Sequence, residues 1–179
     1  MNSGVISTRY ARAVYEYAEQ NNCETAIYEE VKLLAKNYGD FPNLQKVLLN
    51  PTISIEKKIQ VLITACGINI NPVLEKTIKM VVENGRAEYM ENIALMYQEI
   101  YRKAKGIVVV NLTTAEPLTE EIQQALLKIV PKEENEKIFE FDKTIDSSII
   151  GGFILEIKDR QMDASVKKQL NQLKLNLTE

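Results

Sequence analysis

"KGIVVVNLTT", residues 105–114, is the stretch at which the sequence changes its pattern. Up to Lys105, apolar residues recur every three or four positions, which is the period of an amphipathic helix. After Gly106, four β-branched residues follow in succession, and such runs favour strands. The sequence therefore predicts two domains, a helical one at residues 1–105 and one that contains strands at residues 106–179.

The helical domain is predicted to be a bundle of about six helices joined by short loops. Capping residues mark several helix starts: Ser7 for the first helix, Ser54 for the fourth, and Asn71 with Pro72 for the fifth. The pair Asn50–Pro51 ends the third helix, because proline cannot continue one. Each helix carries its own apolar stripe, so this domain can form a core by itself.

The second domain is predicted to follow the order β-α-β-β-α. The first strand, 107–114, precedes a helix that Thr119 starts and Pro131 stops. Apolar and polar residues then alternate in 137–145 and 151–158, which indicates two more strands. A last helix is expected to begin at Asp163. The fold class is thus α+β, an N-terminal six-helix bundle followed by a small C-terminal β-α-β-β-α domain.

Composition excludes several classes of function. The formal net charge is -3, so no general attraction to nucleic acid is implied. The chain has no histidine, which removes the commonest general base and the commonest metal ligand. The two cysteines, Cys23 and Cys66, have no nearby second thiol and are interpreted as structural, with a disulfide or a reactive thiol as the alternative.

The first residues of the chain have two interpretations. Arg9 and Arg12, with serines and no acidic residue before Glu16, resemble a mitochondrial transit peptide. The continuous helical period favours a folded first helix instead. No apolar run approaches the roughly 18 residues that a membrane-spanning helix needs.

The pair Gly151–Gly152 raises the question of a phosphate-binding loop. Such a loop needs its glycines between a strand and a helix, whereas this pair lies between two predicted strands. A tight connection that needs positive φ or close backbone approach is the preferred interpretation. Asp163 is expected to cap the last helix, with Ser165 in its first turn. No catalytic, cofactor-binding or metal-binding residue is therefore predicted.

The same stretch resembles a known family. Residues 146–170, "DSSIIGGFILEIKDRQMDASVKKQL", are similar to the C-terminal signature of the delta subunit of the rotary F-type ATP synthase, the family of the mitochondrial oligomycin-sensitivity-conferring protein. The matching residues are Asp146, Ser148, Gly151, Gly152, Met162, Asp163, Ser165, Val166 and Leu170. Stretches 10–18, 81–101 and 113–121 match as well, so the resemblance covers essentially the whole chain.

The resemblance implies a non-catalytic stator subunit of a proton- or sodium-translocating ATP synthase, without a cofactor. The helical domain would bind N-terminal helices of the alpha subunits, and the second domain would bind the C-terminal ends of the b subunits. The chain would be a monomer when isolated and would lie at the cytoplasmic face of the bacterial plasma (inner) membrane, attached only through the complex. A generic helical adaptor and a small nucleotide-binding protein are the alternatives.

The first helix is apolar on more than one side, which has two explanations. Either the helix is deeply buried, or one side is a groove for a partner helix. The resemblance favours the groove, beside the fifth helix. The candidate partner-binding residues are Tyr10, Ala13, Val14, Tyr17, Val82, Gly85 and Arg86. Arg86 is expected either at the rim of the groove or as a cap for the carbonyls that end the fifth helix.

Overall fold

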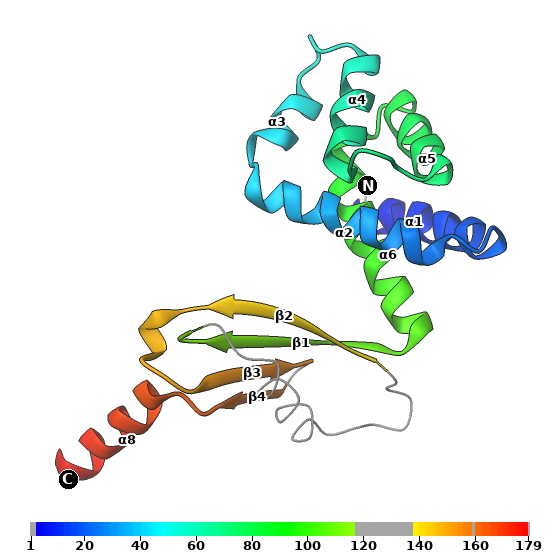
Figure 1. Ribbon diagram of the computed structural model, residues 1–179. Helices are drawn as coiled ribbons and strands as arrows, with labels where there is room; N and C mark the ends of the chain where they lie inside the picture. Colours follow the sequence, from blue (N-terminus) through cyan, green and yellow to red (C-terminus); the bar gives the residue numbers. More distant parts are fainter. Residues whose placement is uncertain (1–2, 117–137, 159, 179) are drawn as a thin grey trace. The chain divides into compact units, whose positions relative to one another are not determined.

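The computed structural model describes residues 3–116, 138–158 and 160–178. The chain divides into two compact units, Met1–Ala104 and Lys105–Glu179, and each is described here by itself (Figure 1). Among the described residues, no helix is both long and apolar enough to cross a bilayer.

The first unit is built from helices in its described part, as predicted. A short 3₁₀ helix, η1, precedes the last α-helix. The elements are α1 (Ser3–Gln20), α2 (Glu24–Asp40), α3 (Asn43–Leu49), α4 (Ile55–Cys66), α5 (Pro72–Glu83), η1 (Ala87–Tyr89) and α6 (Met90–Lys105).

Side-chain caps define two of these helix starts. The Ser54 hydroxyl accepts a hydrogen bond from the Lys57 N–H at 3.4 Å, and the Asn71 side chain accepts one from the Val73 N–H at 2.9 Å. Both caps confirm the sequence prediction. The prediction for Ser7 is wrong, because α1 begins at Ser3 and Ser7 lies fully buried inside it.

Helices α1, α2, α4, α5 and α6 all contribute side chains to the core of the first unit. Tyr28 of α2 stacks on Tyr101 of α6, with ring centroids 4.3 Å apart. The Tyr97 hydroxyl donates to the Glu24 carbonyl at 3.1 Å, so that this buried phenol has a partner. The largest fully buried apolar side chains of this unit are Tyr97, Ile27, Leu34, Leu62, Leu74, Ile78, Met90 and Val81.

The described part of the second unit is a four-stranded mixed sheet and a helix. The sheet order is β2-β1-β3-β4; β1 and β2 are parallel, and the other neighbours are antiparallel. The elements are β1 (Ile107–Thr114), β2 (Ile138–Ile145), η2 (Ser147–Ile149), β3 (Phe153–Ile157), β4 (Arg160–Asp163) and α8 (Val166–Thr178). The helix predicted between Thr119 and Pro131 lies outside the described residues.

The alternating pattern of the predicted strands is confirmed by the sheet. Val110, Leu112 and Leu155 form its buried centre. Four half-buried side chains pack on them: Phe139, Phe141, Phe153 and Ile157. These residues meet because Val110 lies opposite Phe141 on one side and Ile157 on the other.

Strand β4 was not predicted, and the last helix begins later than expected. Residues 160–163 pair with β3, with Met162 opposite Leu155, and α8 starts at Val166 and not at Asp163. β4 is a short edge strand, and three of its four residues are exposed. It therefore lacks the apolar alternation from which a strand is recognised in sequence.

Candidate partner-binding site

Helix α1 buries one side and leaves the other open. Ala11 is 0% exposed, and Val14, Tyr15 and Ala18 are also buried. Ala13 is exposed, and Tyr17 keeps 47% of its surface exposed. The wide apolar surface of α1 is therefore not explained by burial alone.

A groove of about 220 Å³ runs between the open side of α1 and helix α5. It is lined by Ala13, Val14, Tyr17, Val73, Lys76, Thr77 and Met80. The Thr77 hydroxyl already donates to the Val73 carbonyl at 2.9 Å, so its proton is not offered to a guest. Of the described residues that line the groove, Lys76 alone is charged. The groove thus presents an apolar surface with one cation at its edge.

Tyr10 and Arg86 join α1 to the end of α5. The Arg86 Nη1 donates a hydrogen bond to the Tyr10 hydroxyl, and the guanidinium carbon lies 5.5 Å from the centroid of the tyrosine ring. Gly85 precedes Arg86 with φ +68°, a conformation that glycine adopts without steric cost. The Arg86 side chain is therefore directed to α1, which favours neither of the two roles expected from sequence.

The seven candidate residues do not share one surface. Ala13, Val14 and Tyr17 line the α1–α5 groove. Val82 and Gly85 line a different hollow of about 360 Å³, together with residues of α3 and α4. Val82 is only 3% exposed, because it continues the buried stripe of α5.

The sequence reasoning missed four groove residues on α5: Val73, Lys76, Thr77 and Met80. They lie on the side of the helix next to its buried stripe. A helical-wheel projection of α5 with α1 placed beside that stripe would have identified them.

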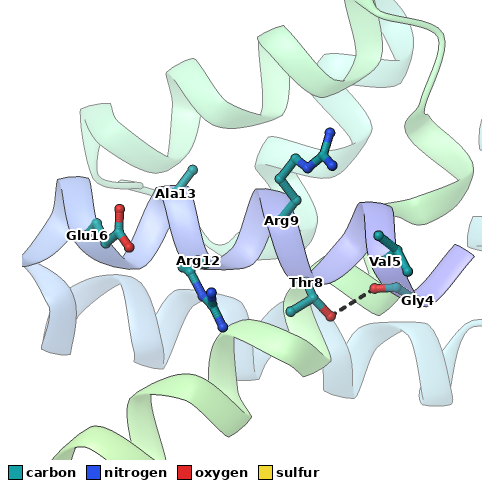
Figure 2. A pocket seen from close by; sticks show the side chains of 7 residues that line it. All are labelled: Gly4, Val5, Thr8, Arg9, Arg12, Ala13 and Glu16. Carbon is teal, nitrogen blue, oxygen red and sulfur yellow. Dashed lines mark hydrogen bonds between the residues drawn. The ribbon is translucent and has the colours of Figure 1, made fainter.

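Another hollow lies along the outer surface of α1 (Figure 2). It is lined by Gly4, Val5, Thr8, Arg9, Arg12, Ala13 and Glu16. Arg9 and Ala13 point to one edge of this hollow, and Arg12 points to its other edge (Figure 2). Ala13 lines both this hollow and the α1–α5 groove, so the two are continuous at that residue.

In the second unit, Asp146 organises the turn before the glycine pair. Its two carboxylate oxygens accept hydrogen bonds from the Ser148 N–H and the Ser148 hydroxyl, each at 2.9 Å. These bonds stabilise the charged carboxylate and lower the pKa of Asp146 below its usual range.

The glycine pair packs against the start of α8. Gly152 has φ +76°, and a Cβ placed on it would lie 2.3 Å from the Ala164 carbonyl oxygen. The Gly151 carbonyl accepts a hydrogen bond from the Val166 N–H at 3.0 Å. Gly152 thus combines positive φ with close backbone approach, which is the interpretation preferred from the sequence.

Ser165, and not Asp163, caps helix α8. The Ser165 hydroxyl accepts a hydrogen bond from the Lys168 N–H at 3.2 Å. Asp163 lies outside the helix and accepts from the Ser165 N–H at 2.9 Å; its bonds to Ser165 lower its pKa. The expectation that Asp163 caps the helix is corrected, because α8 begins three residues later. Ser165 is only 3% exposed and is engaged in this cap.

Known proteins match this chain along nearly its whole length. The model of the family "ATP synthase delta (OSCP) subunit" matches residues 6–177. ATP synthase subunit delta of Azobacteroides pseudotrichonymphae genomovar. CFP2 is 48% identical over 178 residues, which cover 99% of this chain and 100% of the relative. The subunit of the same name from Bacteroides thetaiotaomicron is 37% identical over 176 residues, covering 97% and 94%.

A solved structure has a similar fold. One chain of the cryo-EM structure of the Toxoplasma gondii mitochondrial ATP synthase hexamer superimposes with a TM-score of 0.65 at 20% identity, covering 97% of both chains. This likeness concerns the fold. The family match and the full-length relatives show that the chain belongs to the ATP synthase delta (OSCP) subunit family and is a non-catalytic part of the ATP synthase complex.

Proposed function

We propose that the chain connects the catalytic head of an ATP synthase to its peripheral stalk and so resists the torque of the rotor. Residues 1–105 bind an N-terminal helix of an alpha subunit, and residues 106–179 bind the C-terminal ends of the b subunits. The complex moves protons or sodium ions, and this chain lies at the cytoplasmic face of the bacterial plasma membrane, held there through the other subunits.

The α1–α5 groove is the observation that carries the head-binding part. Its walls are apolar, and Tyr17 and Met80 remain 47% and 44% exposed in the isolated chain. An amphipathic helix laid along the groove would bury these side chains, and burial of apolar surface contributes about 25 cal/mol per Å². Ala13 leaves room for close approach, because its side chain is a single methyl group.

The exposed stripe of α8 supports the stalk-binding part. Val166, Leu170 and Leu173 recur at helical spacing and are 36%, 50% and 58% exposed. An amphipathic helix normally buries such a stripe against another element. A helical end of a b subunit would cover it.

Titration calorimetry with the full chain tests both parts. One synthetic peptide has the N-terminal sequence of the alpha subunit from the same organism, and the other has the C-terminal sequence of the b subunit. Ala13→Asp should weaken the alpha peptide at least about tenfold, because it places an unpaired charge in an apolar contact. Leu170→Glu should weaken only the b peptide.

The matched control for the second variant is Leu175→Glu. Leu175 is also exposed but lies well away from the Leu170 and Leu173 stripe around the helix. If neither peptide binds the wild-type chain, the proposed contacts are wrong. If both bind but the variants have no effect, the contacts lie on other surfaces.

A further inference from the structure

Two cations flank the α1–α5 groove, one on each helix. Lys76 lines the groove from α5, and Arg9 lines the adjoining outer hollow of α1, which shares Ala13 with the groove (Figure 2). Both side chains are exposed, and in the part of the chain that the structure describes neither forms an ion pair. Lys79, one turn away, differs, since its Nζ lies 2.6 Å from a Glu75 carboxylate oxygen.

The acidic residues near the groove do not cancel these charges. Glu16 lines the outer hollow of α1 together with Arg9 and Arg12, so one negative charge stands beside two positive charges there. Glu83 of α5 lines the hollow on the other side of that helix, beside Val82. Arg86 adds a third cation at the end where it bonds to Tyr10. The residues around the groove therefore carry more positive than negative charge.

The two flanking cations lie at different levels of the groove. Tyr10 of α1 contacts Arg86 after α5, while Tyr17 and Val73 line the same groove further along, so α1 and α5 run in opposite directions. Arg9 lies next to Tyr10, which contacts Arg86 just after α5 ends at Glu83. Lys76 lies seven residues before Glu83, so about two helical turns, roughly 10 Å, separate the two levels.

We propose that the groove selects an acidic amphipathic helix, with carboxylates on both sides of its apolar stripe about two turns apart. This inference rests on the proposed function, which places a helix in the groove, and adds the charge that the helix must carry. One carboxylate of the guest faces Arg9 and the other faces Lys76. Charge pairs at the edge of an interface mainly set partner choice and association rate.

Three designed peptides of about 18 residues test the charge preference directly. They share one apolar stripe and differ only at two flanking positions about seven residues apart, which carry Glu, Gln or Lys. Titration against the full chain at about 50 mM NaCl should give the highest affinity for the Glu peptide, a lower one for the Gln peptide and the lowest for the Lys peptide. The affinities of the Glu and Lys peptides should differ about tenfold. At about 500 mM NaCl the difference should shrink several-fold, because salt screens exposed charges.

Charge reversals on the chain locate the effect. Arg9→Glu and Lys76→Glu should each weaken the Glu peptide roughly threefold and strengthen the Lys peptide. Lys103→Glu is the matched control: a cation is likewise reversed, but Lys103 is exposed on α6 and lines neither the groove nor the outer hollow of α1. It should change both affinities much less.

The outcomes separate this inference from the proposed function. Equal affinity for all three peptides, or a preference for Lys, overturns the inference even if the alpha-subunit peptide binds. An equal effect of Lys103→Glu and Arg9→Glu also overturns it, since the charge effect would then be general. If the alpha-subunit peptide does not bind but the chain still prefers the Glu peptide, the proposed partner is wrong and the charge preference of the groove stands.

Discussion

The carbonyl oxygen of Ala164 lies where a side chain on Gly152 would begin. A Cβ on Gly152 would approach that oxygen to 2.3 Å, well inside van der Waals contact, and Gly152 has φ +76°. The glycine therefore meets two demands, a left-handed backbone and close approach of another backbone segment. It lets the start of β3 lie against the residues that lead into α8.

Gly152→Ala should destabilise the second unit by at least about 2 kcal/mol, through backbone strain and the clash with Ala164. Urea unfolding of the full chain, followed by a probe in each unit, would measure this. Gly85→Ala is the matched control, because Gly85 also has positive φ but has no atom within 4 Å of the added Cβ. It should cost about 1 kcal/mol in the first unit. Equal costs would mean that the approach to Ala164 is unimportant.

The same substitution should affect the stability of the chain strongly at Ala11 and hardly at Ala13. Ala11 is fully buried, so Ala11→Asp should lower the free energy of unfolding by at least about 3 kcal/mol. Ala13 is exposed, so Ala13→Asp should change it by less than about 0.5 kcal/mol. Thermal melts followed by circular dichroism suffice. Severe loss of stability in Ala13→Asp would place this residue in the core and remove it from the groove.

The bond between Arg86 and Tyr10 should contribute to the packing of α1 on the end of α5. A double-mutant cycle with Tyr10→Phe and Arg86→Ala should give a coupling energy of about 1 kcal/mol in unfolding experiments. Single effects that simply add would show that the contact contributes nothing to stability. Tyr10→Phe keeps the aromatic ring, so Arg86→Ala removes the ring contact whether residue 10 is Tyr or Phe, and the cycle reports mainly the hydrogen bond. Arg86→Lys offers a second cycle that retains the charge.

Glu30 should make the stability of the first unit depend on pH. Its Oε1 accepts the Asn71 N–H at 2.7 Å, while its Oε2 is buried and has no hydrogen-bond partner among the described residues. Burial raises the pKa of Glu30 above the ordinary 4.5, although the bond from Asn71 opposes this shift. The folded state thus binds the proton more tightly than the unfolded state, and stability from this group falls as pH rises from 4.5 through the raised pKa.

Glu30→Gln keeps an acceptor and removes the titration. The wild-type chain should match this variant most closely near about pH 4 and should be the less stable of the two near about pH 8. Urea unfolding at both values measures the difference. Glu29→Gln, at an exposed neighbouring position, is the control and should show no such divergence. A Glu30→Gln variant that is less stable at the higher pH would reverse the assigned sign.

Local patterns in the sequence were sufficient for most elements. Ser54 and Asn71 start helices with side-chain caps, and the alternation of Phe139 and Phe141 placed one face of a strand in a core. Such signals depend on residues a few positions apart, so they can be read without knowledge of the tertiary fold. Strand β4 carries no such signal, because its pairing with β3 is what makes it a strand.

The residues that line the groove could be identified only from tertiary contacts. The sequence showed that α1 is apolar around much of its circumference, but it did not show which side faces the core. The packing of α1 on α5 decided that Ala11 is buried and Ala13 is open, and it placed Val82 in a different hollow from Tyr17. Residues 76 positions apart, Tyr10 and Arg86, meet beyond the end of α5. Helical periodicity determines which residues share a face, whereas the direction of that face depends on which helices pack beside it.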